Sequence, residues 1–198
     1  MAAAAHLRRL RDTLDGPIIL GELSARLGRE GVGLLVFICA LPFLQPIPLA
    51  GLGTPIGFLL AAAGLQLTLG RTSAVLPRFI AEHRLEAASA TRLLSAAERI
   101  LGVAERAARP RWRAFAHLPK VYGVAIILLG MIFAIPIFVP LGNPATAIPL
   151  AMIGLALLEE DGLLGALGLV GTGATLIYHV ACVRLMWSGI HAAFMKFT

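Results

Sequence analysis

Charged residues are scarce in this sequence, and they are unevenly distributed. Asp, Glu, Lys and Arg make up 14% of the 198 residues, whereas an ordinary soluble domain contains about 25%. Three blocks contain none of them and together hold about half of the chain: residues 31–70, 121–158 and 162–183. This distribution excludes a disordered protein and most soluble enzyme folds. It predicts a small helical membrane protein.

Cysteine is almost absent, and the common catalytic motifs are missing. Cys39 and Cys182 both lie in charge-free blocks, which predicts two small buried apolar residues rather than a disulfide scaffold or a metal site. The sequence contains no glycine-rich phosphate loop, no nucleophile elbow and no metal-ligand spacing. We therefore expect a protein that is not an enzyme and needs neither cofactor nor metal.

The charges that remain are mostly basic, and the formal net charge is +6. Residues 71–120 contain ten Lys or Arg against four Glu, so the positive-inside rule predicts that this segment is cytoplasmic. Helical spacing over residues 82–108 predicts a basic amphipathic helix. It is either the solvated face of a packed helix or a surface against anionic lipid. The arginines assigned to lipid contact recur at intervals of seven: Arg92, Arg99, Arg106 and Arg113. No nucleic-acid motif accompanies them, so we expect no nucleic-acid partner.

Prolines interrupt the first two charge-free blocks in the same pattern, Pro-x3-Pro-x8-Pro, at a constant offset of 94 residues. The matching positions are Pro42, Pro46 and Pro55 in the first block and Pro136, Pro140 and Pro149 in the second. A proline inside a helix removes a hydrogen bond and clashes with the preceding turn. The pattern therefore predicts an internal duplication in which these six residues break the helices.

Each broken block predicts a re-entrant helical hairpin. A helix over residues 31–41 would be about 16 Å long and one over 56–70 about 22 Å, whereas the bilayer core is about 30 Å thick. Non-helical backbone at that depth is tolerated only within protein or beside a wet cavity. The alternative is one ordinary kinked span per block. That alternative would place the weakly basic N-terminus and the strongly basic 71–120 segment on opposite faces of the membrane.

The third block predicts one full transmembrane helix, within residues 162–187. Its glycines give it a small-residue face for close packing: Gly165, Gly168, Gly171 and Gly173. The predicted fold is thus a single all-α integral membrane domain over 1–198. It consists of an N-terminal amphipathic segment (1–30), a hairpin (31–70), the basic cytoplasmic segment (71–120), a second hairpin (121–158) and the final span.

Candidate binding residues are the few polar side chains at the edges and breaks of the apolar blocks. Arg29 and Glu30 precede the first hairpin, and Glu160 and Asp161 follow the second. If the two pairs faced one cavity, they would suit proton coupling. The alternative is that Arg29 and Glu30 form an interfacial pair, and that Glu160 and Asp161 are acids that favour the N-terminus of the final helix. The breaks themselves contain Gln45, Thr54, Asn143 and Thr146. These side chains either bind an ion or phosphate head group with the freed backbone, or simply satisfy that backbone.

Several stretches resemble the ExoD family of bacterial exopolysaccharide-synthesis membrane proteins. They are residues 22–31 (ELSARLGREG), 41–48 (LPFLQPIP), 54–57 (TPIG), 66–71 (QLTLGR) and 160–164 (EDGLL). The resemblance covers roughly residues 15–190. It implies a multi-pass protein of the bacterial inner membrane linked to exopolysaccharide production, and it supplies no enzyme mechanism. The doubled hairpins also resemble the DedA membrane family, in architecture only.

Two functions follow from these observations. The first is a small transporter or lipid-carrier flippase for an ion or an anionic, phosphate-bearing substrate, acting as a homodimer in the lipid bilayer. The alternative is a non-transporting accessory or scaffold protein of a polysaccharide-synthesis or envelope complex.

Overall fold

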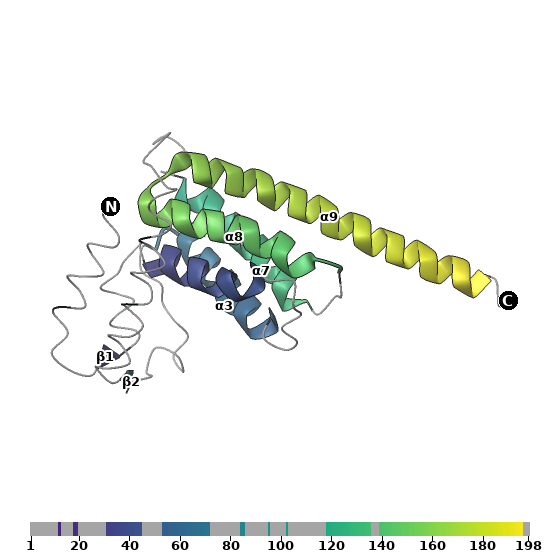
Figure 1. Ribbon diagram of the computed structural model, residues 1–198, viewed down its shortest axis with the longest axis horizontal. Helices are drawn as coiled ribbons and strands as arrows, with labels where there is room; N and C mark the ends of the chain where they lie inside the picture. Colours follow the sequence, from purple (N-terminus) through teal and green to yellow (C-terminus); the bar gives the residue numbers. More distant parts are fainter. Residues whose placement is uncertain are drawn as a thin grey trace.

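The computed structural model is built mainly from helices (Figure 1). It describes residues 12, 18–19, 31–44, 53–71, 84–85, 95, 102, 118–135 and 139–195, with the backbone alone at 18–19, 84–85 and 190–194. A helix over residues 31–40 ends in the 3-10 turn η1 (Leu41–Leu44). The longer helices are α3 (Gly53–Thr68), α7 (Pro119–Ala134), α8 (Gly142–Glu159) and α9 (Gly162–Met195). Within these ranges, the structure confirms a largely helical protein.

A two-residue strand pair departs from the expected all-α fold. Strands β1 (Ile18–Ile19) and β2 (Arg84–Leu85) pair antiparallel, with Ile18 opposite Leu85. The prediction that a helix begins at residue 82 is therefore wrong at 84–85, because backbone pairing with the β-branched Ile18–Ile19 segment replaces helical hydrogen bonds there. Ser95 and Gly102 are helical. The predicted lipid-contact residues lie outside the described residues: Arg92, Arg99, Arg106 and Arg113.

The first helices of the two repeats end at corresponding positions. One ends at Ala40 and the other, α7, at Ala134, 94 residues later. Each is followed by one residue and then a proline, Pro42 or Pro136. A residue before proline is pushed out of the helical region, and Ile135 is indeed extended, with φ −86° and ψ 117°. The α-helix thus ends ahead of the proline in both repeats, and in the first repeat the chain continues through Pro42 as the 3-10 turn η1.

Two of the prolines assigned to breaks lie inside helices. Pro55 is the third residue of α3, where a proline is tolerated because first-turn N–H groups have no helical partner. Pro149 lies in the middle of α8, which continues through it to Glu159. The prediction that Pro55 and Pro149 interrupt the helices is therefore wrong. Pro42 in η1 and Pro140 in the turn before α8 do lie at breaks, whereas Pro46 and Pro136 lie outside the described residues.

The helices of the two repeats pack reciprocally. In one pairing, α7 runs antiparallel to α3: Gly57 lies beside Gly130 and Ala134. In the other, the 31–40 helix runs antiparallel to α8: a Cβ added at Gly33 would come within 2.9 Å of the Gly154 carbonyl oxygen. The first helix of each repeat therefore contacts the second helix of the other. This exchange is what two related halves packed around a pseudo-twofold axis would give.

The last helix, α9, packs antiparallel against α8 and then continues past the other helices toward the C-terminus (Figure 1). Its small residues allow the close approach: a Cβ at Gly168 would lie 2.6 Å from Ile153, and one at Gly171 would lie 3.1 Å from Pro149. Gly165 likewise faces Tyr122 of α7. Gly173 has no neighbour within 4 Å, so the predicted small-residue face is right for three of its four glycines.

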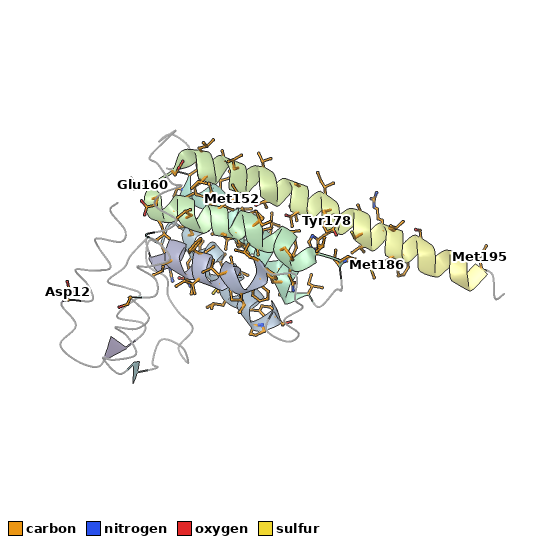
Figure 2. All side chains as sticks on the ribbon, viewed as in Figure 1. Asp12, Met152, Glu160, Tyr178, Met186 and Met195 are labelled. Atoms are coloured by element: carbon orange, nitrogen blue, oxygen red, sulfur yellow. The ribbon has the colours of Figure 1, made fainter. Side chains whose placement is uncertain are left out.

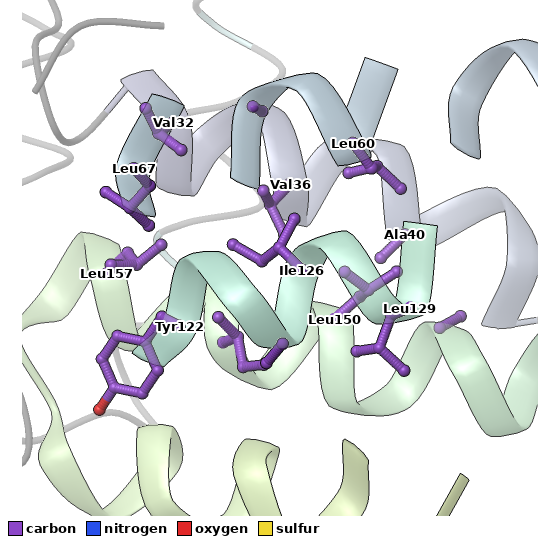
Figure 3. Packing of buried hydrophobic residues seen from close by; sticks show 14 of the residues in the cluster. Val32, Val36, Ala40, Leu60, Leu67, Tyr122, Ile126, Leu129, Leu150 and Leu157 are labelled. Atoms are coloured by element: carbon purple, nitrogen blue, oxygen red, sulfur yellow. The ribbon is translucent and has the colours of Figure 1, made fainter. Parts of the chain in front are cut away.

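The buried core lies where these helices meet, and the outer faces are apolar too. Figure 3 shows core side chains from both repeats, among them Val36, Leu60 and Ile126. The outward face of α7 is also hydrophobic, with Val121, Val124, Leu128, Met131 and Ile135 each 40–48% exposed. Within the described ranges, two helical stretches are long and apolar enough to cross a membrane, Gly142–Glu159 and Gly162–Gly189. Large apolar side chains on the outer surface together with such helices indicate membrane association.

Candidate functional site

Polar groups of the helical bundle gather at its two ends. One end, here called the break end, contains η1 and the starts of α3 and α8. The opposite end, here called the charged end, contains Arg71, Lys120 and the acidic turn between α8 and α9. Figure 2 shows Glu160 at the charged end and Tyr178 toward the break end. The 18 residues of α8 separate the two ends by about 27 Å.

Among the residues described at the break end, an aromatic contact and a hydrogen bond join the two repeats. The rings of Phe43 in η1 and Phe133 in α7 stack with centroids 4.5 Å apart. The Thr54 hydroxyl at the start of α3 donates to the Ala134 carbonyl oxygen at 3.2 Å. That carbonyl belongs to the last turn of α7, where helix geometry provides no partner. Thr54 thus satisfies freed backbone across the repeats.

The other two described break residues lie in the first turns of α8. Thr146 is fully buried and its hydroxyl donates to the Gly142 carbonyl oxygen at 2.8 Å. Asn143 is half-buried. The structure therefore brings Thr54, Asn143 and Thr146 to the same end of the bundle, as the repeat predicts. The bonding of Thr54 and Thr146 favours their role in satisfying backbone over direct ligand contact.

Pro149 leaves a backbone acceptor that sequence reasoning missed. Because proline has no N–H, the carbonyl of Ala145 one turn earlier loses its helical donor. The Thr175 hydroxyl of α9 donates to this carbonyl at 2.7 Å, and Thr175 is only 4% exposed. The signal in the sequence is a hydroxyl residue on the glycine-rich face of α9. Its partner follows only from the alignment of α9 with α8.

Two ring side chains of α9 extend the same contact. The Tyr178 hydroxyl donates to the Pro140 carbonyl in the break before α8, so Tyr178 joins α9 to this break. His179 donates from Nδ1 to the Thr175 carbonyl at 2.9 Å. A Cβ on Gly142 would lie 3.2 Å from His179 Nε2. His179 Nε2 therefore lies close to the N-terminus of α8.

The backbone before α8 adopts an unusual conformation. Leu141, the residue before the helix, has φ 53°, in a left-handed region that costs a non-glycine residue about 1–2 kcal/mol. Leu141 contributes no side-chain hydrogen bond to the helix N-terminus, and the first turn of α8 has no acidic residue. Such outliers are concentrated at functional sites. The break before α8 is therefore a candidate site on geometric grounds.

At the charged end, the acidic residues have a clear structural role. Asp161 is 2% exposed, and its Oδ1 accepts hydrogen bonds from the backbone N–H groups of Leu163 at 2.9 Å and Leu164 at 3.3 Å. This is the N-cap of α9. Glu160 is exposed and ends α8 in a left-handed conformation, with φ 52°. The geometry favours the helix N-terminal interpretation of this acidic turn over a binding role.

The predicted site residues thus form two separate groups. Thr54, Asn143 and Thr146 lie at the break end, and Glu160 and Asp161 lie at the opposite end. Arg29, Glu30 and Gln45 lie outside the described residues, so the predicted meeting of Arg29 and Glu30 with the acidic turn stays a prediction. Among the described residues, no cluster of His, Cys, Asp or Glu could hold a metal ion.

Comparisons with known proteins place the chain in a family. Residues 3–181 match the family model described as exopolysaccharide synthesis, ExoD. The chain is 28% identical to the protein ExoD of Rhizobium meliloti over 183 residues, which cover 86% of this chain and 76% of that protein. It is 30% identical to an uncharacterized protein of Synechocystis sp., covering 90% of this chain and 82% of that protein. No solved structure matches the chain. The chain belongs to the ExoD family of exopolysaccharide-synthesis proteins.

Proposed function

We propose that this protein is a small inner-membrane transporter or flippase for an anionic, phosphate-bearing substrate, and that it is not an enzyme. The observation that carries the proposal is the reciprocal packing of two related helix pairs whose breaks lie at one end of the bundle. Paired broken helices in two halves of a chain are typical of transporter binding sites. We place the substrate site at the break end, next to Asn143 and His179.

The depth of the breaks supports this placement. Positions along α9 give an estimate of depth in the membrane. The charge-free stretch of this helix from Gly162 to Val183 is about 32 Å long, close to the thickness of a bilayer core. Tyr178, which contacts the break at Pro140, lies about 24 Å along α9 from Gly162. The turns of the hairpins would therefore lie within the apolar layer, short of its far side, as re-entrant hairpins require.

The chemistry of the break end favours an anion. The backbone acceptors freed there are occupied: Thr54 binds the Ala134 carbonyl and Thr175 binds the Ala145 carbonyl. The helix N-termini, which attract anions, are left without acidic side chains, because neither α3 nor α8 has one in its first turn. Backbone N–H groups at these helix N-termini would donate to a phosphate group, and no acidic side chain in their first turns would repel it.

The orientation follows from charge. Placing the charged end and residues 71–120 in the cytoplasm satisfies the positive-inside rule, and both hairpins then enter from that side. The protein would be a homodimer in the bacterial inner membrane. Cysteine-accessibility mapping at residues 15, 45, 90, 143 and 195 tests this arrangement: cysteines at 15 and 90 should react from the cytoplasm and a cysteine at 195 from the other side.

Transport is tested in proteoliposomes that contain a fluorescent polyprenyl phosphate in both leaflets. A membrane-impermeant quencher should remove more than half of the fluorescence if the protein moves the lipid between leaflets. We expect Asn143→Leu to lower the rate about tenfold, whereas Gly173→Ala, at a position with no neighbour within 4 Å, should be unchanged. The absence of any flux of this lipid, of inorganic phosphate or of protons would refute the proposal.

The accessory function has one observation in its favour. The 34 residues of α9 are about 51 Å long, much longer than a bilayer core. Beyond the break end they expose large apolar side chains, including Leu185 (74%), Trp187 (69%) and Met195 (77%). A partner subunit of a polysaccharide-synthesis complex would cover this surface. A synthase that co-purifies with the wild type and is lost on Leu185→Glu, without any flux, would establish this function instead.

A further inference from the structure

An open groove lies on the outer surface near the charged end, away from the proposed transport site. Its volume is about 450 Å³, within the range of about 300–1,000 Å³ that is usual for small-molecule sites. Three helices line it: α3 through Thr68, α7 through Lys120, Val121, Val124, Ala125 and Leu128, and α9 through Leu169 and Thr172.

The wall of the groove is apolar apart from one cation. Both threonine hydroxyls are engaged within their own helices, Thr68 with the Gly64 carbonyl at 2.9 Å and Thr172 with the Gly168 carbonyl at 2.8 Å. Lys120 is the one charged residue among those that line the groove, and no carboxylate lines it. A ligand that fits must therefore combine a long apolar part with a negative group at one end.

The positive charge at the mouth has three sources. Lys120 is exposed in the first turn of α7, which contains no acidic residue, and the N-terminus of that helix adds its own partial positive charge. Arg71 is exposed just beyond the end of α3. That end packs beside the start of α7, where a Cβ on Gly123 would meet Thr68. The described acidic residues of this end, Glu159, Glu160 and Asp161, belong to the α8–α9 turn, and none of them lines the groove.

We propose that this groove binds one acyl chain of an anionic phospholipid, with the lipid phosphate at Lys120. From Lys120 to Leu128 the groove follows α7 for about 12 Å, and beyond it the exposed apolar face of α7 continues to Ile135. A zwitterionic lipid would bring a positive group to Lys120, and free phosphate would leave the apolar wall uncovered. Charge complementarity with an apolar track therefore selects an anionic lipid. The site is independent of transport.

Native mass spectrometry of the detergent-purified full chain tests the proposal, with phosphatidylglycerol and phosphatidylcholine of identical acyl chains as probes. We expect one phosphatidylglycerol to bind about tenfold more tightly than phosphatidylcholine, as a charge-assisted contact provides. Lys120→Gln should abolish this preference and Lys120→Arg should retain it. Val124→Trp should fill the groove and weaken both lipids. Arg184→Gln, which removes a cation elsewhere on α9, should behave as the wild type.

Three results with the two lipids would overturn the proposal. They are equal binding of the two lipids by the wild type, a preference that survives Lys120→Gln, or binding unchanged by Val124→Trp. Displacement of the phosphatidylglycerol by millimolar inorganic phosphate would identify a free-phosphate site and also overturn it. Val124 is 46% exposed, so Val124→Trp should fold, and its melting temperature in detergent verifies this. Because the readout is binding, it is unaffected by whether the protein transports.

Discussion

The α3–α7 interface and the α8–α9 interface both use small residues, but for different reasons. Between α3 and α7 the backbones nearly touch, since a Cβ on Gly57 would lie 2.4 Å from the Ala134 nitrogen and 2.5 Å from the Gly130 oxygen. Between α8 and α9 the small residues leave room for a hydroxyl group, and Thr175 crosses the interface to the Ala145 carbonyl. Glycine packed against backbone distinguishes the first interface, and a hydroxyl that replaces a lost helical donor distinguishes the second.

The difference follows from the prolines. Pro55 lies in the first turn of α3 and costs no hydrogen bond, so α3 only needs a partner that packs closely. Pro149 lies within α8 and removes a donor, so α8 needs a partner that replaces it. Matching prolines of a repeated motif thus impose different demands, because the second helix begins at a different place relative to each proline. In lipid these demands are strict, since no water satisfies a freed carbonyl.

The largest expected effect comes from closing the gap between α3 and α7. Gly57→Ala places a methyl group against two backbone atoms that cannot rotate away, so the helices must separate. We expect a loss of about 3 kcal/mol in the free energy of unfolding, measured by SDS titration in mixed micelles. Gly173→Ala is the matched control: its Cβ has open space and alanine favours helix, so stability should be unchanged or slightly higher. Equal effects of the two substitutions would contradict the close-packing account.

Removing the hydroxyl donor at the second interface should have a smaller effect. Thr175→Val preserves shape and leaves the Ala145 carbonyl without its donor, which should cost about 1–2 kcal/mol. Thr172→Val is the matched control, because the Thr172 hydroxyl bonds only within its own helix, to Gly168, and should cost less. Both side chains are about equally buried, at 4% and 5% exposed.

A double-mutant cycle sharpens this comparison. Pro149→Ala restores a backbone N–H that can reach the Ala145 carbonyl, so Thr175→Val should cost little in that background. The coupling between the two positions should then be about 1 kcal/mol, measured from the same unfolding titrations. A Thr175→Val cost that is identical with and without Pro149 would refute the assignment of this hydroxyl to the proline.

The smallest effect is expected at the turn that joins α8 to α9. Asp161→Ala removes the N-cap of α9 and should lower stability by about 1 kcal/mol, whereas Asp161→Asn keeps a good cap and should be nearly neutral. Flux in proteoliposomes is the second readout. If Asp161→Asn abolishes transport without changing stability, Asp161 takes part in proton coupling and the capping role is incomplete. Glu160→Gln, at an exposed residue, should change neither quantity.

Sequence reasoning located the helices better than it located their contacts. The 94-residue offset placed the ends of both first helices correctly, because a residue before proline rarely stays helical. It misplaced the starts of α3 and α8. Pro55 is compatible with helix because a proline in a first turn costs no hydrogen bond. Pro149 is compatible with helix because a tertiary contact supplies the donor that it removes. It also placed a helix start near Arg84–Leu85, where pairing with Ile18–Ile19 produces a strand.

Of the candidate site, too, only a part could be predicted from the sequence. The polar side chains of the breaks could be identified from the sequence, because polar groups are rare in apolar blocks and must be accounted for. The role of Asp161 as a helix cap was one of two interpretations that the sequence allowed. The partners of Thr175 and Tyr178 could not be found, since each contact spans 30 or more residues and depends on the alignment of α9 with α8.

By itself, the sequence determined that this is an apolar, largely helical protein with a repeated proline pattern, because composition and proline spacing act locally on every conformation of the chain. The tertiary structure decided which helices exchange partners between the repeats, which hydroxyl replaces the donor lost at Pro149, and where Lys120 meets an apolar groove. These features depend on distances between segments far apart in the chain.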